Sequence, residues 1–303
     1  MQHIRRKLLA LAGLMVAPMM ARAFPGMRAD HGGGAAVSGA SAPEGRARVV
    51  SLGGGITEIV YALGAGSRLV GVDVSSVYPA ETASLAHVGY YRNVPVEGVA
   101  ALRPALVLAS DQSGPDGALE QLRSLGIRVE VLPDQPDLPT LQARIEQAAR
   151  ALDRAEAGQA LVARLQGELS QLSGDGHELP QRALSLVAHT STLLMAGEGT
   201  AAHATLALAG FRNAIPGQQG YKPVTAEAMA AAAPDMLVVT EMTVQAQGGM
   251  QRMLALPALA ATPAVREGRV VVMADDLYLT FGPRLPQAVA QLRQALVRMP
   301  ADT

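Results

Sequence analysis

The sequence contains no cysteine and no tryptophan, and only 3 of its 303 residues are Phe and 6 are Tyr. Without cysteine the chain can form no disulfide and has no thiol nucleophile, so its stability must come from its apolar cores. Its 26 acidic and 25 basic residues nearly balance, and the net charge is −1. No block of basic residues interrupts this balance, so nothing indicates nucleic-acid binding.

The sequence also lacks an apolar run long enough to span a bilayer. The apolar run at 8–20 follows three cationic residues at 5–7 and precedes Ala21-Arg22-Ala23. A cationic start, a short apolar core and small residues at a cleavage position are typical of a secretory signal peptide. We therefore expect export, with residues 1–23 as the signal peptide and cleavage near Ala23.

The remaining chain predicts an α/β fold. Residues 24–46, rich in Gly, Ala, Ser and Pro, are expected to form a flexible tether. Strands and helices alternate over 47–150, the pattern becomes wholly helical over 151–173, and the alternation returns over 174–303. This order favours two Rossmann-like lobes with central parallel sheets, joined by a long backbone helix. Expected strands are 48–52, 69–72, 105–109, 128–132, 183–187, 236–239 and 269–273. Expected helices are 56–63, 96–102, 115–125, 137–173 with Gly158 as a possible break, 200–208, 225–231 and 286–298.

The two lobes carry similar sequences. Segment 95–108 (PVEGVAALRPALVL) aligns with 225–238 (TAEAMAAAAPDMLV), which matches Glu97 to Glu227. Each Glu falls in the first turn of an expected helix, where the helix dipole stabilises a carboxylate. Their recurrence in both lobes also suits two docking points for a two-fold symmetric partner. Two related lobes predict a ligand-binding cleft between them.

The motifs of common α/β enzymes are missing. Gly53-Gly54-Gly55 follows a strand, but Glu58 occupies the third glycine position of the dinucleotide fingerprint, so we expect the glycines to allow a close turn. There is no Gly-x-Ser-x-Gly elbow, and the histidines are not paired at metal-binding spacing. After the expected signal peptide, these histidines are His31, His87, His177, His189 and His203. We predict a protein that is not an enzyme, with a nucleotide- or metal-dependent enzyme as an alternative.

Tyr90-Tyr91-Arg92 lies in an expected loop before the Glu97 helix. A phenolate can be an axial ligand of ferric haem, and a nearby guanidinium favours the phenolate. In an extended loop Tyr90 and Arg92 would face one side and Tyr91 the other. An ordinary Tyr–Arg pair on the surface explains the same residues, so both interpretations stay open on residue type alone.

With these residues the chain resembles the haem-binding periplasmic proteins of bacterial haem ABC importers, within the iron-siderophore and cobalamin binding-protein superfamily. The resemblance runs from about 48 to 299, and its most specific part is Gly89-Tyr90-x-Arg92 with Glu97-Gly98. Further matching stretches are 55–66, 68–73, 78–79, 108–110, 195–197, 199–202, 220–223 and 281–283. The chain departs from the usual family pattern at 55–56, at 93–96 and at His203.

The resemblance implies a class III periplasmic binding protein whose lobes move little. It implies that Tyr90 is the axial ligand of the haem iron, supported by Arg92. It also implies that Glu97 and Glu227 dock on arginines of the two permease subunits. The transported ligand would be haem, received from an outer-membrane receptor and passed to an ABC permease dimer.

Several alternatives stay open within this resemblance. Cobalamin or a ferric siderophore is the alternative ligand on the same fold, although the absence of Trp and the Tyr90/Arg92 pair weigh against it. A second haem is also compatible with the family. His189 and His203 are the candidates for its iron ligand.

Overall fold

The computed structural model describes residues 47–172, 181–188 and 190–297. The expected signal peptide at 1–23, the expected tether at 24–46, and His189 lie outside the described residues.

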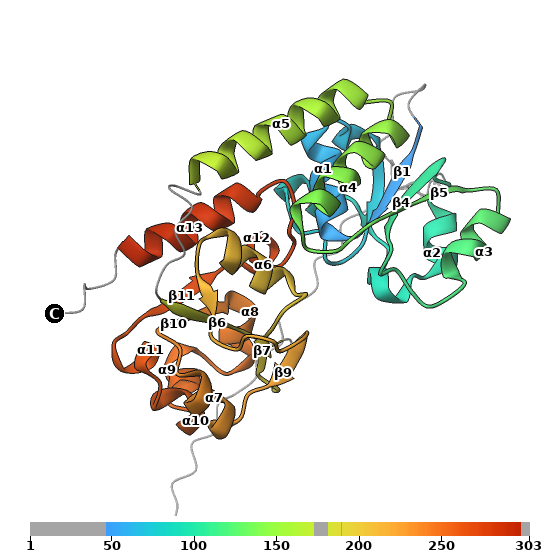
Figure 1. The fold of residues 1–303 in the computed structure, drawn as a ribbon. Helices are drawn as coiled ribbons and strands as arrows, with labels where there is room; N and C mark the ends of the chain where they lie inside the picture. The colour runs from blue at the N-terminus through green and yellow to red at the C-terminus, as the bar shows by residue number, and fades with distance from the viewer. Residues whose placement is uncertain (1–46, 173–180, 189, 298–303) are drawn as a thin grey trace, which may run out of the picture. The chain divides into compact units, whose positions relative to one another are not determined.

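The first half of the described chain forms a five-stranded parallel sheet of order β3-β2-β1-β4-β5. Its strands β1, β4 and β5 are labelled in Figure 1. Every residue of the central strands β1 and β4 is buried, as expected for a parallel sheet covered on both faces. The strand order reverses between β1 and β4, and such sheets place ligands beyond the carboxyl ends of the strands at that point. The strands are β1 (Val49–Leu52), β2 (Leu69–Val72), β3 (Ala86–His87), β4 (Leu106–Ser110) and β5 (Arg128–Leu132).

The helices of this half include one that begins at the glycine triplet. A Cβ on Gly54 would lie 2.8 Å from the carbonyl oxygen of Ser75, so the helix can start there only with glycine. The interpretation of the triplet as a close turn is confirmed. The helices are α1 (Gly54–Ala62), α2 (Val96–Ala101) and α3 (Ala118–Ser124), with short 3-10 turns η1 (Gly66–Arg68), η2 (Ala80–Ser84) and η3 (Tyr91–Asn93).

Two helices, α4 (Leu138–Ala151) and α5 (Ala155–Leu172), follow the first sheet. Asp137 begins α4 by accepting the backbone N–H of Thr140 at 2.7 Å. The helical segment is interrupted at 152–154, where Asp153 has a φ of 56°. Gly158, the break expected from the sequence, instead lies buried within α5.

The second half forms a six-stranded sheet of order β11-β10-β6-β7-β9, with β8 paired to β6. β6, β8, β10 and β11 are parallel, whereas β7 pairs antiparallel with both β6 and β9. The strands β6, β10 and β11 form the expected parallel part, and β7 and β9, which the sequence did not predict, make the sheet mixed. Its strands are β6 (Arg182–Val187), β7 (Leu194–Ala196), β8 (Arg212–Asn213), β9 (Tyr221–Pro223), β10 (Met236–Thr240) and β11 (Val270–Met273).

Helices surround this second sheet, and the last of them, α13, packs along α5. They are α6 (Ala201–Leu208), α7 (Ala226–Ala232), α8 (Glu241–Ala246), α9 (Met250–Leu254), α10 (Pro257–Ala260), α11 (Pro263–Arg266), α12 (Asp275–Tyr278) and α13 (Leu285–Val297). No helix between 47 and 297, as far as that stretch is described, is long and apolar enough to cross a membrane.

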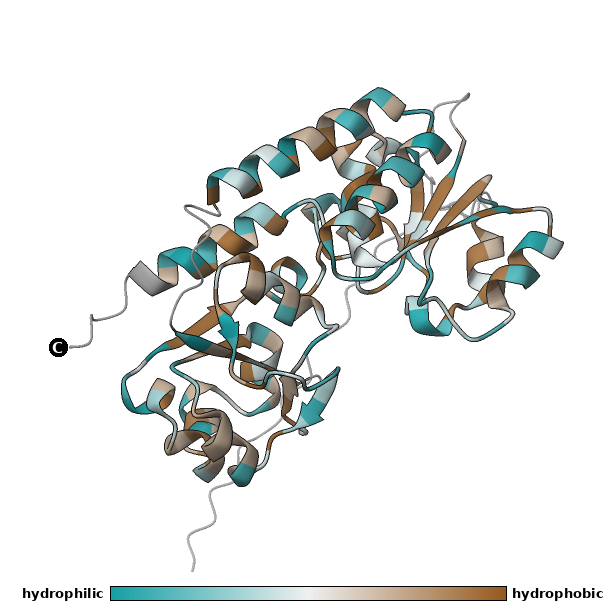
Figure 2. Ribbon diagram, viewed as in Figure 1, coloured by the Kyte–Doolittle hydropathy of each residue, from teal (hydrophilic) through white to brown (hydrophobic). Residues whose placement is uncertain are grey.

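The largest hydrophobic cluster contains side chains from both halves. Val49 and Ile145 of the first half belong to it together with Leu206 and Leu285 of the second. The central strands of both sheets are apolar, whereas the short strand β9 and many exposed helical residues are polar (Figure 2). The two sheets therefore share this cluster, while each also has a cluster of its own on its other face.

Candidate functional site

The tyrosine pair at 90–91 follows β3, at the carboxyl edge of the first sheet. Tyr90 is extended, with φ −100° and ψ 132°, but Tyr91 begins the 3-10 turn η3. The turn brings the two rings edge to face, with their centres 4.9 Å apart. The expectation that Tyr91 faces away from Tyr90 is wrong, because the turn replaces the alternation of an extended loop.

Residues 90–93, called the tyrosine turn below, are joined to the neighbouring loops by backbone hydrogen bonds. Val74, after β2, donates its N–H to the carbonyl of Gly89 at 2.8 Å. Gly114, after β4, donates to the carbonyl of Tyr91 at 3.1 Å and accepts from Val94 at 2.6 Å. Three loops at the carboxyl edge are thus joined into one surface.

Arg92 contacts both tyrosines of the pair. Its guanidinium acts electrostatically on the two phenols, and its central carbon lies 5.2 Å from the ring centre of Tyr91. Partial burial acts to lower the pKa of Arg92, but its interactions with Tyr91 and Tyr90 raise it. The guanidinium therefore stays charged beside both phenol oxygens.

The two phenols differ in their environment. Burial raises the pKa of Tyr91 to about 12, although Arg92 acts to lower it. Tyr91 therefore stays a neutral phenol at physiological pH. Tyr90 leaves 45% of its surface exposed and is the tyrosine of the pair that a ligand can reach.

Arg92 also acts on a tyrosine of the second half. Partial burial raises the pKa of Tyr221, the first residue of β9, and the charge of Arg92 lowers it. Since such an effect requires proximity, Tyr221 lies within electrostatic reach of the tyrosine turn. In the sequence, Tyr221 stands only within the matching stretch 220–223.

Exposed apolar side chains are concentrated in the segments around these strand ends. Most of the large exposed apolar residues that the structure describes lie in the loop after β2, after β3, in β9 or at the start of α8. Exposed apolar patches on a soluble protein commonly mark a ligand or partner site. The residues concerned are Val74, Val77, Tyr78, Tyr90, Tyr221 and Met242.

The buried carboxylate of Asp73 accepts hydrogen bonds from residues at this edge of the sheet. Asp73 accepts the backbone N–H of Gly53 at 3.0 Å and the hydroxyl of Ser76 at 2.8 Å. Its other oxygen accepts the N–H and the hydroxyl of Ser75, at 3.1 and 2.7 Å. Asp73 thus joins the start of α1 to the loop after β2 without a basic partner, since N–H and O–H donors satisfy it.

Glu97 and Glu227 lie where the sequence places them, in the first turns of α2 and α7. Both are exposed, and neither forms an ion pair with a described residue. Thr225 begins α7 by accepting the N–H of Ala228 at 3.1 Å, whereas Pro95 precedes α2 without a side-chain cap. Their docking role stays a prediction.

His203, a candidate for a second iron ligand, is half-buried on α6. Its Nδ1 lies 3.0 Å from the side-chain nitrogen of Asn213, so only Nε2 is free to bind a ligand. Over the described residues, no three His, Asp or Glu side chains gather into a group that could hold a metal ion.

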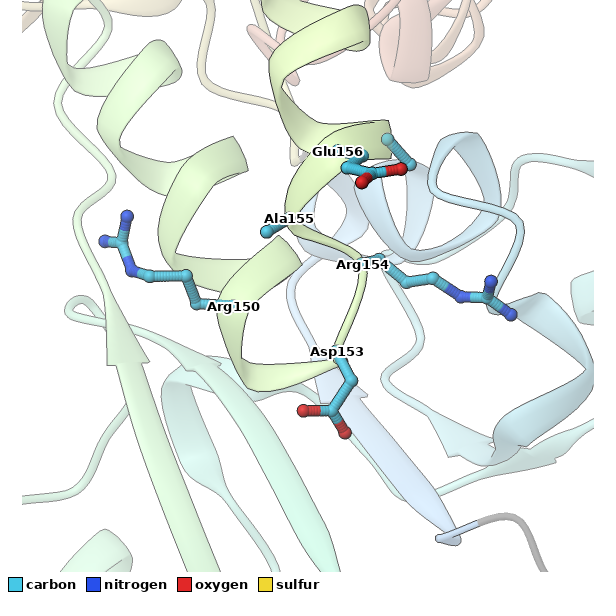
Figure 3. Close-up of a pocket in the computed structure, with 6 residues that line it drawn as sticks. Arg150, Asp153, Arg154, Ala155 and Glu156 are labelled. Atoms are coloured by element: carbon cyan, nitrogen blue, oxygen red, sulfur yellow. The ribbon is translucent and has the colours of Figure 1, made fainter.

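A separate pocket lies at the junction of α4 and α5. Its lining residues are Arg150, Asp153, Arg154, Ala155, Glu156 and Ala157. Figure 3 shows Arg150 and Arg154 pointing in opposite directions from the junction, so these charges do not converge on one ligand position. We assign no function to it.

Sequence analysis missed an ionic cluster around Arg284, which lies between α12 and α13. Arg284 donates its Nε to Glu58 of α1 at 3.0 Å and an Nη2 proton to Asp276 at 2.7 Å. Burial raises the pKa of Glu58, and the hydrogen bond and charge of Arg284 oppose that effect. The available signal was the matching stretch 281–283 immediately before Arg284.

Comparison with known proteins gives one family. The family model described as periplasmic binding protein matches residues 49–277. The chain is similar to the solved structure of the periplasmic haem-binding protein BhuT in complex with two haems, with a TM-score of 0.78 and 39% identity over 83% of this chain and 98% of that one.

Two curated relatives cover most of the chain. An uncharacterised ABC transporter substrate-binding lipoprotein of Bacillus subtilis, YvrC, is 29% identical over 82% of this chain and 79% of the relative. A vitamin B12-binding protein of Pectobacterium carotovorum is 26% identical over 83% of this chain and 89% of the relative.

Proposed function

Because the chain belongs to the periplasmic binding protein family, we propose that it is an exported, non-catalytic protein that captures haem and delivers it to an ABC importer. The accessible Tyr90 beside Arg92 carries this proposal. A phenolate binds Fe³⁺ directly, and a neighbouring cation stabilises the phenolate before and after the iron binds. Arg92 can alternatively pair with a haem propionate.

The surroundings of Tyr90 suit a large apolar ligand that carries anionic groups. Val74 and Val77 expose apolar surface in the loop hydrogen-bonded to the tyrosine turn. Tyr221 supplies a further ring within electrostatic reach of Arg92. A porphyrin needs apolar contact over its faces and a cation near its carboxylates, and these residues offer both.

The test is the absorption spectrum of the purified protein with ferric hemin. Wild type should give a high-spin spectrum of the tyrosinate type. Tyr90→Phe should abolish it and weaken hemin binding strongly, because the iron loses its oxygen ligand. Tyr91→Phe is the matched control and should keep the spectrum. Full wild-type affinity and spectrum in Tyr90→Phe would show that the ligand is elsewhere.

Cobalamin is the second candidate, supported by the similarity to a vitamin B12-binding protein. A ferric siderophore is the further alternative on the same fold. The higher identity to a haem-binding structure and the absence of Trp from the chain favour haem. Parallel calorimetric titrations with hemin and cyanocobalamin distinguish the two, and tighter binding of cobalamin would reverse the preference.

We further propose that the protein acts in the periplasm and docks on a permease dimer through Glu97 and Glu227. Similarity to an ABC transporter substrate-binding lipoprotein supports a permease partner. An outer-membrane receptor would supply the haem. A second haem would need a second ligand, and His203 offers only its Nε2. Mass spectrometry of periplasmic protein should give a chain that starts near Phe24.

A further inference from the structure

The cation at Arg284 lies against an aromatic ring from the other half of the chain. Tyr78 belongs to the loop after β2, whereas Arg284 precedes α13. The central carbon of the guanidinium is 3.6 Å from the ring centre of Tyr78. At this distance the cation covers one face of the ring and attracts it electrostatically.

Two carboxylates hold this guanidinium in place. Glu58, nearly fully buried, accepts from Nε and from Nη2, and Asp276 accepts from the same Nη2. Arg284 can leave Tyr78 only by abandoning a buried carboxylate, which is energetically costly. The ring of Tyr78 therefore packs against a guanidinium whose position is fixed by two carboxylates.

Tyr78 nevertheless stays open to solvent over 43% of its surface. Val74 and Val77 of the same loop are exposed as well, at 50% and 59%. Exposed apolar side chains that lie close together commonly mark a binding site, because covering them with a ligand lowers the free energy. Tyr78, Val74 and Val77 form such a group.

The loop that carries Tyr78 is attached to the tyrosine turn. Val74 donates its backbone N–H to the carbonyl of Gly89, the residue before Tyr90. The buried Asp73 fixes the start of the same loop through four hydrogen bonds. Tyr78 and Tyr90 thus belong to one hydrogen-bonded surface at the carboxyl edge of the first sheet.

Resting on the proposed function, we propose that Arg284 is a positioning residue that holds Tyr78 as an aromatic platform for the flat face of the tetrapyrrole. The ligand surface is then built by both halves of the chain, since the platform belongs to the first half and its support to the second. If Arg284 only joined the two halves, its replacement would change haem affinity by the same factor with or without the Tyr78 ring.

The first experiment measures hemin affinity and the rate of haem transfer to apomyoglobin for Tyr78→Leu and Tyr78→Phe. Tyr78→Leu should weaken binding about three- to tenfold and speed release, while the tyrosinate spectrum of Tyr90 remains. Tyr78→Phe keeps the ring and should bind as wild type does. Tyr61→Leu, the same change at a half-buried tyrosine of α1, is the control and should leave the affinity unchanged.

The second experiment is a double-mutant cycle between Tyr78→Leu and Arg284→Gln. If Arg284 acts through Tyr78, the change in affinity from Arg284→Gln should largely disappear in the Tyr78→Leu background. Should Arg284→Gln fail to fold, Arg284→Lys takes its place in the cycle, and the comparison of Tyr78→Leu with Tyr78→Phe still decides whether the ring is a platform. Wild-type affinity and release rate in Tyr78→Leu, with the tyrosinate spectrum intact, would overturn this inference and leave the proposed function standing. A wild-type protein that binds no hemin would instead refute the proposed function.

Discussion

Gly114 lies so close to Arg92 that a Cβ on the glycine would be 2.9 Å from the arginine's carbonyl oxygen. The same glycine exchanges backbone hydrogen bonds with both ends of the tyrosine turn. Its missing side chain is therefore a condition for the position of Tyr90 and Arg92.

Gly114→Ala should displace the tyrosine turn, and we expect a loss of about 1–3 kcal/mol in stability together with weaker hemin binding. Urea unfolding and hemin titration measure the two effects. Gly167→Ala is the control, because Gly167 lies on α5 with no atom near its Cβ position. It should stabilise the protein by about 0.5–1 kcal/mol and leave hemin binding unchanged. Unchanged hemin affinity in Gly114→Ala would contradict the role of this contact.

Tyr91 should make stability fall at alkaline pH. Burial raises its pKa from 10.0 to about 12, so folding favours the neutral phenol. That contribution is complete below pH 10 and is lost as the pH rises through about 12. Wild type should therefore lose more stability across this interval than Tyr91→Phe, as judged by urea unfolding at stepped pH. Equal losses would mean that Tyr91 ionises as freely in the folded state as in the unfolded one.

Glu58 should show a pH dependence of the same sign at acidic pH. Burial raises its pKa above 4.5, although Arg284 opposes the shift. Its neutral form contributes stability that is complete below pH 4.5 and declines as the pH rises through the raised pKa. Wild type should therefore lose stability relative to Glu58→Gln as the pH rises from below 4.5 through the raised pKa.

The matched control for that comparison is Glu156→Gln, at an exposed carboxylate in the first turn of α5. It measures what the same Glu-to-Gln change does at a carboxylate that is not buried. An advantage of wild type over Glu58→Gln that grows with pH would show that the ion pair with Arg284 outweighs the cost of burial.

Glu97→Ala and Glu227→Ala should impair transport without affecting hemin affinity, because both carboxylates are exposed first-turn residues apart from the tyrosine turn. Each of the two variants should lose no more than about 1 kcal/mol of stability. Growth on haem as iron source and binding to permease in nanodiscs report on docking. Glu156→Ala removes an equivalent helix-start carboxylate and should transport normally. Normal transport by the Glu97→Ala, Glu227→Ala double variant would reject the docking assignment.

Four strands of the first sheet were predictable because they are short β-branched or leucine-rich runs between helical patterns, as in 69–72 and 128–132. The edge strand β3, of two exposed residues, was not among the expected strands. Only some strands of the second sheet could be predicted from the sequence. β7 and β9 have three residues each, which is too short for a periodicity to be recognised. The break before α5 was misplaced for a different reason. Asp153 adopts a left-handed φ that residue type alone did not suggest, while Gly158 remained helical.

In the candidate site, too, local features were predicted from the sequence and long-range contacts were not. The sequence placed Tyr90 and Arg92 together because they are neighbours in the chain. The orientation of Tyr91 depended on a single 3-10 turn and was predicted wrongly. The pairing of Arg284 with Glu58 joins residues 226 positions apart, and no local pattern announces a contact of that kind.

The hydrophobic cluster shared by the two halves affects how the protein unfolds. The principal cluster includes Val49 and Leu141 from the first half and Met236 and Leu292 from the second, so separating the halves would expose apolar surface belonging to both. Neither half can then melt while the other stays native without a large free-energy cost. Heating should accordingly give one cooperative calorimetric transition for the described chain, and either half expressed alone should be prone to aggregation.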